Sequence, residues 1–278
     1  MKPRWEEVTG PIELRKAGVR ALAVDGDDTL YLEANLVEEA WRSTDGGATW
    51  TATPRRPRST SDEQVVEAVD AEGARWRSVR RHDLTFHPGS RPEIVQSAPL
   101  IKRRVERHDG KSWRVLRDDL EAFAFAFAGD GRVWIAADGM GLWGVEELRW
   151  RQVLAARTTA VAVAGERLVV VTNDAVLLST DGGEHFQPCD AGLGQEATPR
   201  FRVQWLDVQK LLGAPDGTVW AFGHKRVCRL APAALTWENL DAGLPQYLDK
   251  IEGFALTRGG VAWVGTRFKG LYRLLNTR

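Results

Sequence analysis

Three features of the sequence predict an all-β fold built from repeated antiparallel units. The chain of 278 residues contains 27 Gly and 12 Trp, a combination typical of repeated β-hairpins. The stretch Ser-Thr-Asp-Gly-Gly, closed by an aromatic residue, occurs twice, at 43–50 and 179–186. Short apolar segments alternate with turns that contain Gly or Asp. Together these features predict a six-bladed β-propeller with four-stranded antiparallel blades.

The first three strands of each blade are predicted from apolar alternation and the turns between. First strands are expected at 19–24, 65–69, 122–127, 160–164, 208–213 and 251–256. Second strands follow at 29–32, 75–79, 132–136, 167–172, 218–222 and 260–266. Third strands are expected at 40–43, 101–107, 141–145, 175–179, 226–230 and 270–274. The third strand of the second blade is obscured by an insertion at 79–104.

The fourth strand of each blade opens on an aromatic residue, at Trp50, Trp113, Trp150, Phe186, Trp237 and Trp5. The last blade has three strands of its own, and the segment 4–8 supplies its fourth. This N-terminal strand therefore closes the ring and removes an open sheet edge. We expect one domain, residues 1–278, with blades near 18–53, 63–116, 120–154, 159–188, 205–240 and 250–278 plus 3–9.

The repeated motif has a simple turn chemistry. Its members are Ser43, Asp45, Gly47 and Trp50 in one copy and Ser179, Asp181, Gly183 and Phe186 in the other. The carboxylate accepts backbone N–H groups, the glycines allow positive φ, and the aromatic packs across the turn. The motif resembles the Asp box of BNR-repeat propellers, a family with sialidases, other glycosidases, sortilin-type receptors and photosystem II assembly factors. The resemblance implies a propeller fold and a structural role for the motif on the outer rim.

Basic residues gather in the predicted loops on one face of the propeller. Loops between second and third strands share this face with the loops between blades, and such a face usually carries the site. The insertion at 79–104 exceeds the ordinary loop length of about 12–15 residues. The predicted partner-binding residues are Arg80, Arg81, Phe86, His87, Arg91, Arg103, Arg104, Lys225, Arg267 and Lys269. A positive surface on a neutral chain favours an acidic protein partner, and the alternative is an ordinary solvated face.

Catalytic motifs are scarce in this sequence. A sialidase needs an early Arg-Ile-Pro motif, which is absent, and the one pair that resembles its Tyr–Glu machinery is Tyr247 with Glu252. Two carboxylates for another glycosidase can always be found among 38 acidic residues, so that signal is not specific. No nucleophile elbow, P-loop or zinc motif occurs, and we predict neither a metal nor a cofactor. Cys189 and Cys228 are expected to pack as small apolar residues.

The leading hypothesis is a non-catalytic protein-interaction scaffold or assembly factor that binds its partner through the loop face. The alternative is a glycan- or small-ligand-binding propeller, and any enzyme among these would be a glycoside hydrolase. Aromatic candidates for such a ligand are Phe86, Trp205, Tyr247 and Phe268. Balanced charge, with 38 basic and 38 acidic residues, argues against nucleic acid and membrane binding. No membrane span or secretory signal is recognised, so the expected location is cytoplasmic.

Overall fold

The computed structural model describes residues 4–25, 27–54, 63–70, 72–82, 100–193, 208–245 and 250–275. The predicted site residues Phe86, His87, Arg91 and Tyr247, with Trp205, lie outside these residues. The one helix among the described residues is α1, Leu14–Ala17. No helix in this part of the chain is long and apolar enough to cross a membrane.

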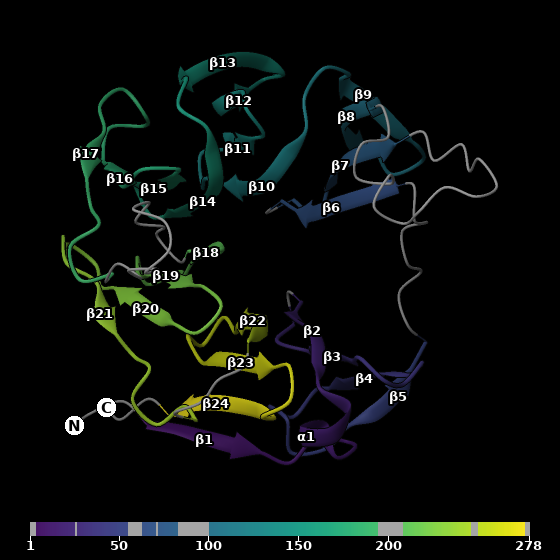
Figure 1. Cartoon of the computed structure of the whole chain (residues 1–278). Helices are drawn as coiled ribbons and strands as arrows, with labels where there is room; N and C mark the ends of the chain where they lie inside the picture. The colour runs from purple at the N-terminus through teal and green to yellow at the C-terminus, as the bar shows by residue number, and fades with distance from the viewer. Residues whose placement is uncertain are drawn as a thin grey trace, which may run out of the picture. The chain divides into compact units, whose positions relative to one another are not determined.

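Six four-stranded antiparallel sheets form a β-propeller, as the sequence predicts (Figure 1). Blade 1 contains β2 (Val19–Val24), β3 (Leu30–Ala34), β4 (Ala40–Ser43) and β5 (Thr51–Thr53). Blade 2 contains β6 (Glu63–Val69), β7 (Arg75–His82), β8 (Leu100–His108) and β9 (Trp113–Arg117). Blade 3 contains β10 (Ala122–Phe127), β11 (Val133–Ala137), β12 (Gly141–Glu146) and β13 (Arg149–Leu154).

The other three blades follow the same order along the chain. Blade 4 contains β14 (Thr158–Ala164), β15 (Arg167–Thr172), β16 (Val176–Ser179) and β17 (Gln187–Pro188). Blade 5 contains β18 (Lys210–Gly213), β19 (Val219–Phe222), β20 (Val227–Leu230) and β21 (Glu238–Asn239). Blade 6 contains β22 (Ile251–Leu256), β23 (Ala262–Thr266), β24 (Leu271–Leu275) and the N-terminal β1 (Arg4–Val8).

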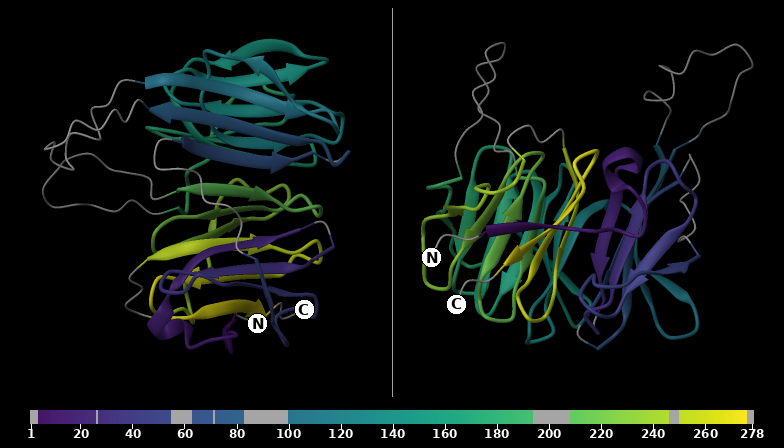
Figure 2. Two further views of the ribbon diagram at one scale, coloured as in Figure 1. Left: turned by 90° about the vertical axis from the view of Figure 1, so that its right-hand side faces the viewer. Right: turned by 90° about the horizontal axis from the view of Figure 1, so that it is seen from below.

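The N-terminal strand completes the last blade, which confirms the prediction from the sequence. Strand β1 pairs antiparallel with β24, from Arg4 opposite Leu275 to Val8 opposite Leu271 (Figure 2). Trp5 anchors the strand, because its indole N–H donates to the Leu240 carbonyl at 2.6 Å. Its ring is 5% exposed and belongs to an apolar cluster of blades 5 and 6.

The chain divides into two compact units, which are described separately. The first comprises Met1–Arg56, Asp174–Leu178 and Phe186–Arg278, and the second comprises Pro57–Asn173 and Ser179–His185. The second strands of blades 3 and 6 are buried throughout: every residue of β11 and of β23 is buried. Small and β-branched side chains at these positions let neighbouring sheets pack on both faces of a strand. That the whole chain is one domain stays a prediction.

The two Ser-Thr-Asp-Gly-Gly hairpins, 43–50 and 179–186, are named the STDGG hairpins here. In the first, Oδ1 of Asp45 accepts the Ser43 hydroxyl at 2.7 Å and the Thr49 amide at 2.9 Å. The Thr49 hydroxyl donates to Oδ2 at 2.5 Å. These bonds, led by that of the Thr49 side chain, lower the pKa of Asp45 to about 2. In the second hairpin the His185 amide is the main cause of a lowered pKa at Asp181.

Each STDGG hairpin covers a tryptophan of the preceding blade. A Cβ on Gly47 would lie 2.7 Å from Cη2 of Trp263, and one on Gly183 would lie 2.8 Å from Cη2 of Trp134. Both tryptophans occupy the second position of the second strand in their blades. The glycine is therefore required twice: it has positive φ, 82° or 84°, and it leaves room for an indole ring.

Candidate functional site

The central hairpin of blade 2 is longer than the sequence predicts. Strand β7 spans 8 residues and β8 spans 9, more than any other described strand. Arg80 and Arg81, expected in a loop, lie in β7 because the ladder continues to His82. Arg80 is opposite Arg103, and Arg81 is opposite Lys102. Like charges in directly opposed positions repel each other unless a carboxylate compensates them, as Glu121 does for Arg80.

Two of the predicted arginines are held by buried carboxylates. Glu106 is 3% exposed and lies between Nε of Arg77, at 2.5 Å, and Nε of Arg104. Glu121 is also buried and accepts from Arg80 at 3.1 Å. Removing such an arginine would leave a buried charge without its partner. Arg80 and Arg104 therefore stabilise the blade, whatever else they bind.

Arg81 and Arg103 are the basic residues of this hairpin best placed for a partner. The Arg81 side chain is exposed and that of Arg103 is half-buried. Asp119 lies near Arg103, and its pKa is lowered mainly by a hydrogen bond from Arg117 and further by the charge of Arg103. We name Arg80, Arg81, Arg103 and Arg104 the blade 2 basic edge.

A second group of predicted residues comes together in blades 5 and 6. The Ile251 amide donates to the His224 carbonyl at 2.6 Å, and the Arg267 amide donates to the Lys250 carbonyl at 2.9 Å. These bonds join the segments that carry the predicted residues. The group is named the blade 5–6 basic edge and comprises Lys225, Arg267 and Lys269. It belongs to the first unit and the blade 2 basic edge to the second, so each is described by itself.

Sequence reasoning missed two lysines beside the blade 5–6 basic edge. Lys210 begins β18, where solvent reaches its side chain, yet desolvation by the surrounding protein lowers its pKa. Lys250 pairs with Glu252 at 3.4 Å. Their position in the chain could have identified them. Lys210 begins the first strand of blade 5 and Lys250 immediately precedes the first strand of blade 6, next to the loops between blades.

The remaining predicted residues form no catalytic constellation that the structure describes. Glu252, a weak catalytic candidate, is half-buried in its ion pair with Lys250, and its proposed companion Tyr247 is outside the described residues. Within the described ranges no group of three His, Cys, Asp or Glu side chains could hold a metal. Cys189 and Cys228 are both buried, as expected for small apolar residues.

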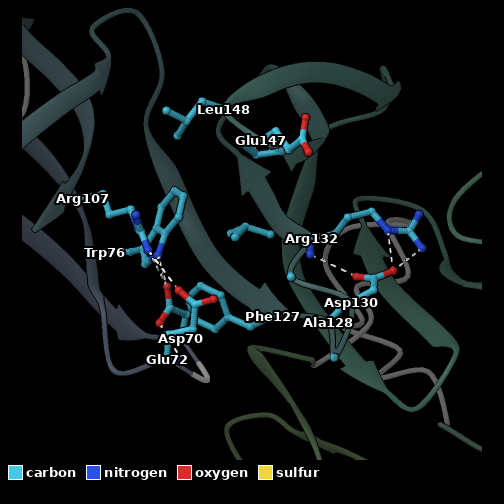
Figure 3. Close-up of a pocket in the computed structure, with 14 residues that line it drawn as sticks. Asp70, Glu72, Trp76, Arg107, Phe127, Ala128, Asp130, Arg132, Glu147 and Leu148 are labelled. Carbon is cyan, nitrogen blue, oxygen red and sulfur yellow. Dashed lines mark hydrogen bonds and ion pairs between the residues drawn. The ribbon is translucent and has the colours of Figure 1, made fainter. Parts of the chain in front are cut away.

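A hollow in the second unit lies at the other end of the blades, and the sequence did not predict it. It has a volume of about 480 Å³ and opens between blades 2 and 3 (Figure 3). Its apolar wall includes Trp76, Phe127 and Leu148. It is bordered by described residues between β6 and β7, by the turn 128–132 between β10 and β11, and by the β12–β13 turn. We name it the blade 2–3 cavity.

Charged groups surround the blade 2–3 cavity in two clusters. On one side, the indole N–H of Trp76 donates to Asp70 at 3.0 Å, and the Arg107 guanidinium lies 3.6 Å from both Asp70 and Glu72. On the other side, Arg132 pairs with Asp130 at 2.6 Å and lowers the pKa of that carboxyl by hydrogen bonding (Figure 3). The cavity thus combines an aromatic and aliphatic wall with ionised rims, a lining typical of ligand sites.

Comparisons with known proteins support the fold. No protein-family model matches the sequence, and no curated protein is similar enough to count as a relative. Among solved structures, virginiamycin B lyase from Staphylococcus aureus is 13% identical with a TM-score of 0.61, covering 98% of both chains. The structure of YCF48 bound to D1 peptide is 14% identical with a TM-score of 0.55, covering 99% of this chain and 97% of that chain. The WD40 β-propeller domain of Doa1 is 10% identical with a TM-score of 0.59, covering 99% and 97%.

Proposed function

We propose that this chain is a non-catalytic scaffold that binds an acidic protein partner through its two basic edges. The observation that carries the proposal is the register of blade 2, where Arg80 faces Arg103 and Arg81 faces Lys102. This end of the two longest described strands therefore concentrates basic residues, of which Arg80 is paired with Glu121. A negatively charged surface docked there would gain electrostatic attraction to Arg81 and Arg103.

The blade 5–6 basic edge supports the same class of partner. The guanidinium of Arg267 lies 5.6 Å from the centre of the Phe268 ring, and that ring is 42% exposed. An exposed aromatic beside basic groups is a frequent composition of protein interfaces. The YCF48 structure with its D1 peptide is an example of a protein with this fold that holds a peptide.

The experiment is an affinity purification of the tagged full chain from its native cells, read by mass spectrometry. The test variant is Arg81→Glu with Arg103→Glu, because Arg80 and Arg104 hold buried carboxylates and their reversal would disturb folding. Arg114→Glu is the matched control: it reverses one exposed charge on β9 of the same blade. A stoichiometric partner that the control retains and the test variant loses is the expected result. If wild type and control both purify alone, the scaffold proposal is wrong.

The alternative function is binding of a glycan or another small ligand, with hydrolysis as its catalytic form. One observation favours it, the exposed Phe268 ring beside Arg267, since sugars and planar ligands stack on such rings. A glycan array tests this alternative by comparing wild type with Phe268→Ala. If no glycan binds wild type more strongly than the variant, the alternative is wrong.

A further inference from the structure

We propose that the blade 2–3 cavity binds an extended segment of a partner protein through a Lys or Arg side chain of that segment. This site is separate from the two basic edges and selects the opposite charge. Three features of the cavity support this inference: the short turn that borders it, the charge of its lining and the shape of its wall.

The cavity is bordered by a short turn of blade 3, which lacks an STDGG hairpin. Trp76 holds the same strand position in blade 2 as Trp134 in blade 3 and Trp263 in blade 6. Trp134 and Trp263 are each covered by a glycine of a long hairpin, 180–186 or 44–50. Between β12 and β13 only Glu147 and Leu148 turn the chain. The cavity lies beside Trp76, where this short turn stands in place of a longer hairpin.

The short turn also holds an apolar side chain over the cavity. Glu147 and Leu148 have φ of 48° and 64°, the conformation that a two-residue hairpin turn of type I′ requires and that Asn-Gly normally supplies. Leu148 is 48% exposed at the cavity rim (Figure 3). A glycine at this position would fit the backbone better, so the leucine is retained at a cost in stability.

The charge of the lining calls for a cation. Four carboxylates, those of Asp70, Glu72, Asp130 and Glu147, stand against the guanidinium groups of Arg107 and Arg132, which leaves two negative charges. Two of the carboxylates are already engaged: Asp70 accepts the amides of Glu72 and Ala74, and Asp130 is bonded to Arg132. The carboxylates left for a ligand are therefore those of Glu72 and Glu147.

The existing contact of Glu72 would not compete with a ligand. Its carboxylate is 3.6 Å from Arg107, beyond hydrogen-bond length, and its side chain is 82% exposed. A ligand cation could approach to about 2.8 Å and form a charge-assisted hydrogen bond.

The wall fits a long aliphatic cation better than a compact ion. Phe127 and Leu148 present carbon surfaces between the charged rims, while Trp76 also lines the cavity but is only 3% exposed. Lys and Arg bury their methylene stems on such surfaces while the charged head reaches a carboxylate. A volume of about 480 Å³ holds more than one side chain, so the neighbouring residues of an extended segment enter with the cation.

The test is a selection from a phage-displayed library of random heptapeptides on the immobilised full chain. The expected result is a pool with Lys or Arg at a fixed position beside apolar residues. Peptides from that pool, measured by fluorescence anisotropy, should bind Glu72→Gln with Glu147→Gln about tenfold more weakly than wild type. Glu166→Gln is the control, since Glu166 is an exposed residue in the β14–β15 turn of the same unit and does not line the cavity.

A second variant guards against misfolding as an explanation. Glu147→Asn with Leu148→Gly installs the preferred type I′ residues, so it should fold at least as stably as wild type while losing the same peptides. The proposal is overturned if no basic pool emerges, or if its peptides bind both cavity variants as tightly as wild type. An acidic pool alone would also overturn it and would point to the basic edges.

Discussion

At the residue scale, Asp45 and Gly47 show how single side chains determine a hairpin and its packing. The Asp45 carboxylate collects hydrogen bonds from Ser43 and Thr49, so it is more stable ionised than protonated. Gly47 supplies the positive φ and the close approach to Trp263. Each role belongs to one residue type, which is why the motif could be read from the sequence.

Ionisation of Asp45 should contribute stability in a defined pH range. Its folded pKa, about 2, is below the ordinary value of 3.8, so the contribution is complete above pH 4. It should be lost as the pH falls from about 4 to about 2, because the unfolded chain then binds the proton first. Urea unfolding across that range should show a smaller loss of stability for Asp45→Asn than for wild type. Equal losses would mean that the carboxylate charge is not stabilised in the hairpin.

Two adjacent glycines of the first STDGG hairpin separate the requirement for positive φ from the requirement for space. Gly46 has φ of 65° with open space around its Cα, whereas Gly47 has φ of 82° and an indole ring against it. Gly46→Ala should therefore cost about 1 kcal/mol, the price of the conformation alone. Gly47→Ala should cost about 2–4 kcal/mol, since a clash is added. Chemical denaturation measures both, and equal costs would contradict the packing on Trp263.

The sequence did not predict which charged side chains are buried. Glu106 lies in a run of basic residues, a context in which an exposed side chain is expected, yet it is among the most buried acidic residues described. Its burial depends on Arg77 and Arg104, which approach it from two strands. Such a cluster arises from strand register, and no local pattern in the sequence specifies it.

At the element scale, hairpin length decides which residues lie over the tryptophan of the preceding blade. The STDGG hairpins bring a glycine against Trp134 and Trp263, whereas the two-residue turn of blade 3 borders the cavity that Trp76 lines. The sequence contained a signal for this difference, because no STDGG motif stands between Val145 and Trp150. The consequence required the structure, since the wall of the cavity comes from two blades.

Replacing the strained turn should stabilise the protein. Glu147→Asn with Leu148→Gly places at positive φ two residues that tolerate it, and should raise the free energy of unfolding by about 1–2 kcal/mol. Thermal unfolding monitored by circular dichroism provides the measurement. A lower unfolding temperature would show that the Leu148 side chain stabilises the fold by more than its conformation costs.

The bounds of most strands were predicted closely, and the main exception is the pair β7 and β8. Segments such as β10 and β22 were placed at their observed bounds, because both are mainly apolar and are followed by a turn that contains Gly. The ends of β7 and β8 were missed, since a run of arginines carries no alternation. Pairing across the hairpin extended these strands beyond the pattern.

At the scale of the whole molecule, the N-terminal strand joins the two ends of the chain in one sheet. Strand β1 covers the edge of β24 and inserts Trp5 among Trp220, Phe254 and Leu274. The number of predicted strands indicated this arrangement, because the extra strand at the N-terminus matched the strand missing from the last blade.

Trp5→Ala should be among the most damaging single substitutions. It removes a buried ring and the hydrogen bond to Leu240, so we expect a loss of about 3–5 kcal/mol. Trp113→Ala is the comparison: that ring is half-buried on β9 and contacts Arg77 at 4.0 Å, so its loss should cost about 1–2 kcal/mol. Guanidinium unfolding ranks the two. A smaller effect at Trp5 would mean that β1 contributes little to the last blade.

The most direct test of a partner-binding scaffold is the salt dependence of its affinity for the captured partner. Titration calorimetry of the purified full chain should show binding that weakens at least tenfold between about 0.05 and 0.5 M salt, because attraction between opposite charges is screened. Arg81→Glu with Arg103→Glu should weaken binding at low salt and flatten the dependence, while Arg114→Glu should behave as wild type. Affinity that is independent of salt and unchanged in the double variant would contradict recognition through the basic edges.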